Sequence, residues 1–394
     1  MRIPITKTVF DEMDMKLIQE PLKSGWVVQG PFVKQFEDAF ASFTGSAYAV
    51  ATSSCTTALH LSLCALGIGP GDEVIVPAFT WIATANVVEY IGARPVFCDI
   101  DLRTFDLDVG QLAERLNPRT KAIIPVHLFG LPAEMDALLG LARKYQFHII
   151  EDAACGFGAR SHGQHVGTFG DFGCFSFHPR KAITTGEGGM ILTQDAKLAE
   201  LCRSLRDHGA SKSDLARHHG KAAFLLSEFN QLGFNYRMTD IQGALGVGQM
   251  RKANWIQERR YARAGRYEQL LREFTWLQRP AVPEGIQHGY QSYVCLFTPE
   301  NPTLANLDHL HDLRNSLMMR LEESGVSTRQ GTHAVTNLGY YEKKYRIKCT
   351  DYSNALLADR LSITMPLYAQ MSDEEQDFVI ESLQGAYLEA ACVA

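Results

Sequence analysis

Short apolar runs alternate with segments of helical periodicity between about residues 45 and 195. The runs that predict strands are 48–52, 74–76, 95–98, 122–126, 147–150, 172–177 and 189–193. The segments that predict helices are 56–66, 80–91, 134–145 and 197–205. Such alternation predicts an α/β fold, in which a parallel or mixed sheet is covered by helices on both faces.

The pattern changes after residue 205. A polar, irregular stretch at 206–235 predicts an exposed excursion, and 239–272 predicts a solvated connecting helix. Further on, we expect strands at 293–298 and 326–329 and helices at 307–323, 353–360 and 372–387. We therefore expect a large domain at 1–250, with an N-terminal arm, and a second part at 251–394 that holds the connecting helix and a small C-terminal α+β domain.

The composition excludes several classes of protein. The 394 residues are 46% hydrophobic and 21% charged, a mixture typical of globular domains and unlike disordered chains. The 38 basic and 44 acidic residues give a net charge of −6, and no Lys/Arg-rich run stands out, so we expect no nucleic-acid partner. The N-terminus resembles no signal peptide and no apolar run could span a membrane, which predicts a cytoplasmic protein without a membrane partner.

The cysteines and histidines do not predict a metal site. None of the nine cysteines forms a CxxC pair, and most of them lie in apolar runs, as buried thiols of a reducing compartment do. Three histidines lie within the polar excursion, at His208, His218 and His219, but they lack partner ligands at metal-binding spacing. We therefore expect no metal.

Polar clusters follow three of the predicted strands. They lie at 53–57, at Asp152 and at 176–181. Ligands of open α/β sheets bind outside the carboxyl ends of the strands. These clusters are therefore the candidate functional residues.

Lys181 is the most informative of them. It lies in FSFHPRKAITTGEGG (175–189), between an apolar strand and a glycine-rich turn. A surface lysine is the plainer interpretation. The functional interpretation is a lysine that forms a Schiff base with a carbonyl compound, a role that calls for partial burial and a depressed pKa.

Two further features fit pyridoxal 5′-phosphate. Asp152 ends a predicted strand and could keep a pyridine nitrogen protonated, although a strand-end aspartate is more often a loop or capping residue. The stretch 53–57 begins a predicted helix, whose free N–H groups could bind phosphate, although it could equally be an ordinary Ser/Thr cap. Ser176 could add one more hydroxyl.

With these residues in view, the sequence resembles the DegT/DnrJ/EryC1/StrS sugar aminotransferases. The resemblance runs from about Gly25 to about Leu383. Its matching stretches, in order, are GWVVQGPFVKQFEDAFA (25–41), SSCTTALHLSLCALGIGPGDEVIVPAFTWIATAN (53–86), EDAACGFGA (151–159), GDFGCFSFHPRKAITTGEGG (170–189) and GFNYRMTDIQGALGVGQM (233–250).

The resemblance implies the fold-type I architecture of pyridoxal phosphate enzymes, with a mixed, mostly parallel sheet between helices. It implies that Lys181 and Asp152 are catalytic, Lys181 as the internal aldimine and Asp152 as the partner of the pyridinium nitrogen. The implied cofactor-binding residues are Cys55, Thr56, Trp81, Asp152, Cys155, Ser176, Lys181 and Asn235. Because Asn235 would reach the cofactor of a second subunit, the resemblance also implies a homodimer with shared active sites.

Two positions depart from the family pattern. Cys55 stands where a small residue, often Gly, is usual, and Cys155 stands where many members have Gln, Glu or His. A side chain at Cys55 is tolerable if only its backbone faces the phosphate. The hydrogen bond that other members make from the position of Cys155 is lost or replaced here.

The implied reaction is a ping-pong transamination. An amino acid, L-glutamate in most of the family, leaves its amino group on the cofactor as pyridoxamine 5′-phosphate, and a 4-keto or 3-keto deoxysugar carried on a nucleotide then accepts it for polysaccharide or lipopolysaccharide synthesis. Members that dehydrate sugars have His in place of Lys181, so this chain favours amino transfer. The alternatives are a keto-cyclitol or other carbonyl acceptor, and a non-catalytic regulatory member. The residues that could border the substrate, or merely belong to loops, are His178, Glu187, Arg237 and His333.

Overall fold

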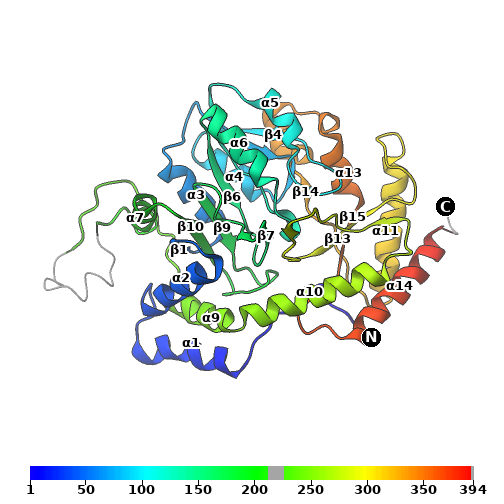
Figure 1. Cartoon of the computed structure of the whole chain (residues 1–394), viewed down its shortest axis with the longest axis horizontal. Coiled ribbons are helices and arrows are strands. Elements are labelled where there is room, and N and C mark those ends of the chain that lie inside the picture. The colour runs from blue at the N-terminus through cyan, green and yellow to red at the C-terminus, as the bar shows by residue number, and fades with distance from the viewer. Residues whose placement is uncertain (212–225, 392–394) are drawn as a thin grey trace.

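The structure is a computed structural model that describes residues 1–211 and 226–391. The middle of the predicted excursion, with His218 and His219, lies outside the described residues, as does Cys392. Figure 1 shows the whole chain from its N-terminal helices to α14.

A seven-stranded sheet forms the centre of the molecule, in the order β1-β10-β9-β6-β5-β2-β4. Only β10 runs antiparallel to its neighbours, so the sheet is mixed and mostly parallel, as predicted. All seven strands overlap the predicted ones, although β5 lies two to three residues earlier than expected: β1 Tyr48–Thr52, β2 Glu73–Pro77, β4 Arg94–Cys98, β5 Thr120–Ile123, β6 His148–Asp152, β9 Phe172–Ser176 and β10 Gly189–Thr193. Their apolar, β-branched runs suit strands that are buried on both faces.

Helices cover both faces of this sheet (Figure 1). Those predicted from periodicity are α3 Cys55–Ala65, α4 Ala83–Tyr90, α6 Met135–Tyr145 and α7 Ala196–Leu205. Shorter turns complete the connections: η1 Val109–Gln111, α5 Leu112–Arg115 and η2 Leu128–Gly130. The N-terminal arm adds two helices that the sequence pattern did not predict, α1 Glu12–Ser24 and α2 Pro31–Thr44.

The predicted helix at 239–272 is two helices, α9 Asp240–Arg251 and α10 Ala253–Leu270. The expectation that this segment is solvated is wrong for one face of α10, because Arg260 and Arg263 are only 2% and 8% exposed. Arg260 is buried because its guanidinium donates to the carbonyl of Tyr290, 2.9 Å away. A charge pattern alone does not reveal such an acceptor.

A smaller three-stranded sheet, in the order β11-β13-β15, follows α10 in the chain and lies on the same side of that helix as the large sheet (Figure 1). It contains β11 Leu277–Gln278, β13 Tyr293–Phe297 and β15 Ser362–Met365, with helices α11 Leu307–Glu323, α12 Gly339–Tyr345, α13 Ser353–Leu361 and α14 Asp373–Ala391, and the turns η3 Val335–Asn337 and η4 Cys349–Asp351. The strand expected at 326–329 is wrong. Only isolated bridges form there, from Val326 to Ile3 and from Arg329 to Thr364.

Short strand pairs complete the fold. They are β3 Phe79–Thr80 with β14 His333–Ala334, and β7 Arg160–Ser161 with β8 Gln164–His165 and β12 Ile286–Gln287. Because β3 occupies Thr80, α4 begins three residues later than expected. One apolar cluster contains Val50 and Ile150 of the large sheet together with Val294 and Leu296 of β13. The two sheets thus share packing, and a domain boundary near residue 250 stays a prediction.

No helix in the described parts of the chain is both long and apolar enough to cross a membrane. The cytoplasmic location stays a prediction. All cysteines that the structure describes are free thiols.

Candidate active site

The three predicted polar clusters meet at one edge of the large sheet. Strands β6 and β9 are parallel neighbours, and β1 and β9 run in the same direction because both are antiparallel to β10. Their carboxyl ends therefore lie on the same edge. Asp152 ends β6, Ser176 ends β9, and Thr52 ends β1 just before α3.

Lys181 lies in the loop that follows β9. Its Nζ donates to Sγ of Cys155, 3.1 Å away, and its backbone N–H donates to the carbonyl of His178. Burial alone lowers the pKa of Lys181, but Cys155, Cys55 and Asp152 together raise that pKa more. The pKa of the free amine is thus raised in this arrangement, whereas the role of a Schiff-base lysine calls for a lowered one, and that role stays a prediction.

Asp152 is buried at 5% exposure. Its Oδ2 accepts from the hydroxyl of Thr84 at 2.8 Å, and its Oδ1 accepts from the N–H of Ala154 at 3.1 Å. Burial raises the pKa of this carboxyl, and the hydrogen bonds and the Lys181 charge oppose that rise. Sequence reasoning missed Thr84, because its hydroxyl matters only through a carboxylate that is distant in sequence.

The N-terminus of α3 lies beside these groups. Ser54 is the N-cap, with a reciprocal capping box to Thr57. The N–H groups of Cys55 and Thr56, in the first turn, have no acceptor within the helix and can bind an anion. The thiol of Cys55 donates to the carbonyl of Cys174 on β9, at 3.4 Å. Its side chain is therefore turned to the sheet, and the backbone remains to face a phosphate.

Ser176 lies close to the same helix end. It pairs with Gly189 of β10, which in turn pairs with Thr52 of β1. A Cβ on Gly189 would lie 2.3 Å from the carbonyl oxygen of Ser54. The strand and the helix N-terminus thus approach so closely that only glycine fits between them.

Trp81 and His333 form the other side of the site. Trp81 is 61% exposed, just before α4. Its ring centroid lies 6.0 Å from that of His333, which β14 holds opposite Thr80. The structure therefore brings His333, far away in sequence, next to the indole that was predicted to stack on the cofactor.

The other candidate residues are less closely connected. His178, in the lysine loop, has a pKa that burial lowers and that nearby Glu187 partly restores. Arg237 is paired with Asp207, so its guanidinium is already in use. Asn235 is exposed on a segment whose next residue, Tyr236, accepts a hydrogen bond from the N–H of Ser53.

The functional groups of these residues match the parts of pyridoxal 5′-phosphate that a protein must bind. A half-buried amine, a buried carboxylate and a helix N-terminus converge at one edge, and an indole lies exposed beside them. Those are the groups that would hold its carbonyl, ring nitrogen, phosphate and ring face, respectively. Among the described residues, no cluster of three or more His, Cys, Asp or Glu side chains could hold a metal ion.

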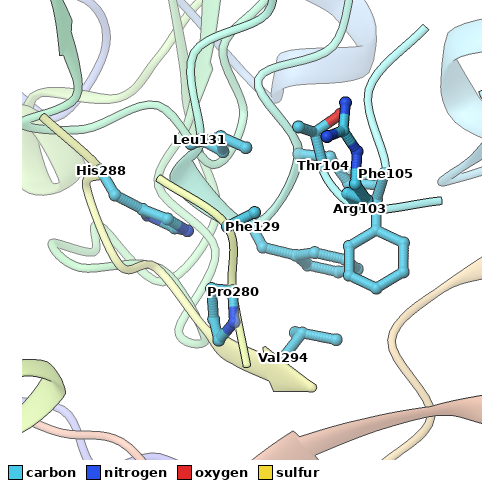
Figure 2. Close-up of a pocket in the computed structure, with 10 residues that line it drawn as sticks. Arg103, Thr104, Phe105, Phe129, Leu131, Pro280, His288 and Val294 are labelled. Atoms are coloured by element: carbon cyan, nitrogen blue, oxygen red, sulfur yellow. The ribbon is translucent and has the colours of Figure 1, made fainter. Parts of the chain in front are cut away.

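A small pocket elsewhere carries none of these groups (Figure 2). Its walls are mostly apolar, with the rings of Phe105 and Phe129 edge to face at 5.7 Å. His288 is its one imidazole, and burial lowers the pKa of His288 to about 3, so the ring is neutral. Its Nδ1 already accepts from the N–H of Tyr290, at 2.8 Å.

Comparisons with known proteins agree on one family. The model of the DegT/DnrJ/EryC1/StrS aminotransferase family matches residues 9–384. The chain is 37% identical over 384 residues to GDP-perosamine synthase of Caulobacter vibrioides, covering 97% of each chain. It is 36% identical over 382 residues to the spore coat polysaccharide biosynthesis protein SpsC of Bacillus subtilis, covering 97% of this chain and 96% of SpsC.

A solved structure has the same fold. It is Spr1654 of Streptococcus pneumoniae, assigned as a sugar aminotransferase and solved in its PMP form. The TM-score is 0.90 at 27% identity, over 100% of this chain and 99% of that chain. The prediction of a fold-type I architecture is confirmed.

Proposed function

The chain belongs to the DegT/DnrJ/EryC1/StrS aminotransferase family, and on this basis we propose that it moves the amino group of L-glutamate to the keto group of a nucleotide-linked sugar. The acceptor would be a 4-keto or 3-keto deoxysugar, and the product would serve polysaccharide synthesis. The observation that carries this proposal is the convergence of the Lys181 amine and the buried Asp152 carboxylate at one edge of the sheet. The names of the relatives GDP-perosamine synthase and SpsC support the sugar, the nucleotide and the polysaccharide.

Five residues would hold the cofactor on which the family depends. When bound, pyridoxal phosphate supplies a carbonyl that condenses with amines and a ring that takes up negative charge. The N–H groups of Cys55 and Thr56 would bind its phosphate, with the hydroxyl of Ser176. Trp81 would cover one ring face, and Asp152 would hold the proton at the ring nitrogen.

Lys181 would be the group that transfers the proton. Its uncharged amine takes the proton from the α-carbon of the donor amino acid, holds it at Nζ, and releases it as the amino group is transferred. The same groups run the second half-reaction in reverse with the keto sugar. Asp152 keeps its negative charge throughout, because it acts as a fixed electrostatic partner for the protonated ring nitrogen.

The acceptor would enter past Trp81 and His333. The indole is exposed, and the imidazole beside it is 3.8 Å from Asp359, which can orient it. His178 and Glu187 would border the site from the lysine loop. Arg237 is the least direct of these candidates, because Asp207 already pairs with it.

We also propose a homodimer with shared active sites. Asn235 is exposed, and its amide would reach the phosphate bound by a second subunit. Large apolar side chains that are exposed on nearby segments support a subunit interface there: Val27, Val28, Phe229 and Leu232. Sedimentation of Asn235→Ala beside the unchanged protein, with cofactor retention measured in both, tests this.

A substrate screen tests the main proposal. The purified protein with cofactor is given L-glutamate and either a keto-sugar nucleotide or a keto-cyclitol, and 2-oxoglutarate is measured. Turnover only with the sugar nucleotides supports the proposal. Turnover only with cyclitols would favour the alternative acceptor. The non-catalytic alternative is set aside, because the family and its named relatives are aminotransferases.

A further inference from the structure

We propose that Thr84 is a positioning residue for the aminotransferase reaction: its hydroxyl, aligned by Thr80, orients and stabilises the carboxylate of Asp152. The inference rests on the proposed function, since it takes Asp152 as the partner of the cofactor's ring nitrogen. Thr84 would not touch the substrate or the reacting atoms. It would act through Asp152 alone.

The buried hydroxyls of Thr80 and Thr84 form a chain of hydrogen bonds that ends at the carboxylate of Asp152. Oγ1 of Thr80 lies 3.0 Å from Oγ1 of Thr84, and Oγ1 of Thr84 lies 2.8 Å from Oδ2 of Asp152. Thr80 is 1% exposed and Thr84 is fully buried, so water does not compete with this arrangement. The other carboxylate oxygen, Oδ1, accepts from the N–H of Ala154. Each oxygen therefore has one fixed donor.

The charge on Asp152 sets the direction of both hydrogen bonds. An ionised carboxylate only accepts, so Thr84 must donate to it. Thr84 then has only lone pairs to offer, and Thr80 must donate to Thr84. Both O–H groups point toward the negative charge, and hydrogen bonds aligned in this way polarise and strengthen one another.

Such support matters because the carboxylate is buried. Burial raises the pKa of Asp152, and the hydrogen bond from Thr84 is the largest influence that opposes the rise. The titratable groups that interact with this carboxyl come from several elements: Lys181 of the loop after β9, His127 of the loop after β5, Cys55 of α3 and Cys174 of β9. Without Thr84, Oδ2 would lose its only side-chain hydrogen bond among the described residues.

The position of Thr84 is itself fixed from two sides. Its backbone N–H donates to the carbonyl of Trp81, at 3.1 Å, at the start of α4. Thr80 is held by the pairing of β3 with β14, opposite His333. The hydroxyls of Thr80 and Thr84 thus connect the β3–β14 pair, which lies beside Trp81, to the carboxylate of Asp152.

The test uses paired variants of the full-length protein with cofactor. Thr84→Val removes the hydroxyl at nearly constant volume, Thr84→Ser keeps it, and Thr80→Val removes only the second hydroxyl. The control is Thr336→Val, because Thr336 is also fully buried but its hydroxyl has no hydrogen-bond partner in the described chain. The readouts are the dissociation constant of pyridoxal phosphate, the pH dependence of its visible absorption, and kcat with KM for glutamate.

Thr84→Val should weaken cofactor binding about tenfold, the usual effect of losing a hydrogen bond to a charged group. The pH at which kcat falls in acid should rise by about one unit, because Asp152 then takes up a proton more readily. The midpoint of the absorption titration in acid should rise by the same amount. KM for glutamate should stay within about twofold of its original value. Thr84→Ser should restore the cofactor affinity and both pH profiles, Thr80→Val should show a smaller change of the same sign, and Thr336→Val should show none.

An Asp152→Asn background separates the possible failures. There, Thr84→Val should change the dissociation constant by less than about twofold, because the charge that it supports is gone. An equal effect in both backgrounds would mean a packing role and would overturn the inference, as would unchanged binding and pH dependence in Thr84→Val alone. If Asp152→Asn itself leaves cofactor binding unchanged, the proposed function fails at Asp152, and this inference fails with it.

Discussion

The Nζ atom of Lys181 lies 3.1 Å from the Sγ atom of Cys155. The contact follows from topology, because the two residues lie in loops that leave the carboxyl ends of the adjacent parallel strands β9 and β6. The partner of the Cys155 thiol in this structure is therefore the lysine amine.

Replacing Cys155 should change the titration of Lys181. Cys155 raises the pKa of Lys181, so Cys155→Ala should lower that pKa and increase the uncharged amine at any given pH. The rate at which the cofactor-free chain recombines with pyridoxal phosphate should therefore rise at lower pH than in the unchanged protein. Stopped-flow absorbance across a pH series measures this. Cys349→Ala is the matched control, and coinciding profiles for all three proteins would refute the prediction.

Gly189→Ala should damage the phosphate site. The new Cβ would lie 2.3 Å from the carbonyl oxygen and 2.6 Å from the next amide nitrogen at the start of α3, so the helix end must shift. Cofactor affinity should fall by at least about tenfold, since phosphate-binding N–H groups must point at the ligand. Equilibrium titration with pyridoxal phosphate measures it.

Gly140→Ala is the control for that substitution. Gly140 lies inside α6, and an added Cβ meets nothing within 4 Å. Alanine there should leave cofactor affinity unchanged and stabilise the fold by about 0.5–1 kcal/mol. Equal losses of affinity in the two variants would show that the close approach at Gly189 is unimportant.

Asp152→Asn should stabilise the cofactor-free chain while weakening cofactor binding. Burial raises the pKa of the folded carboxyl above its unfolded value, so the unfolded state binds fewer protons and stability falls as pH rises. The gain in the variant should be about 1.4 kcal/mol for each pKa unit of that shift near neutral pH, and it should shrink as pH is lowered toward about 4. Denaturant melts of both proteins at two pH values test this, and a gain that grows in acid would contradict it.

A buried ion pair supports the strand that leads into the phosphate site. Glu37 of α2 accepts from Arg206 at 2.7 Å and from the N–H of Ala51 at 2.9 Å, and both charged side chains are 5% exposed. Arg206→Met leaves the carboxylate buried without its partner and should cost about 3–5 kcal/mol of unfolding free energy. The double variant Glu37→Leu with Arg206→Met should cost less than Arg206→Met alone.

The exposed pair of Lys34 and Asp38 on the same helix is the control for the buried pair. Their side chains are 59% and 65% exposed. Asp38→Ala should cost no more than about 0.5 kcal/mol. Similar losses for the buried and the exposed pair would contradict this account of Glu37 and Arg206.

The large sheet could be predicted from sequence because each strand is a compact apolar run. The strands at Tyr48–Thr52 and Gly189–Thr193 form at the predicted residues. Elements that depend on distant partners could not be predicted in this way. The sequence pattern predicts a helix at Thr80, which instead pairs with His333, and it predicts a solvated α10, although the buried Arg260 donates to the carbonyl of Tyr290.

In the candidate site, too, residues marked by local sequence could be predicted and those that depend on distant partners could not. Lys181 and Asp152 were predictable because each follows an apolar strand. Thr84 was not, since its hydroxyl matters only through a carboxylate that lies 68 residues away in sequence. Burial alone lowers the pKa of Lys181, but its neighbours Cys155 and Asp152 raise it, and neither neighbour can be inferred from the sequence around the lysine.

Amino-group transfer through Lys181 is the central claim, and one rapid-mixing measurement tests it most directly. The protein with bound cofactor and its Lys181→Ala variant are each mixed with L-glutamate, and the visible absorbance and 2-oxoglutarate are followed over a single turnover. The unchanged protein should lose its visible band as it releases 2-oxoglutarate, and Lys181→Ala should do so at least about 100-fold more slowly, the minimum expected for loss of the proton-transfer group. Release of 2-oxoglutarate by Lys181→Ala at the unchanged protein's rate would contradict the account.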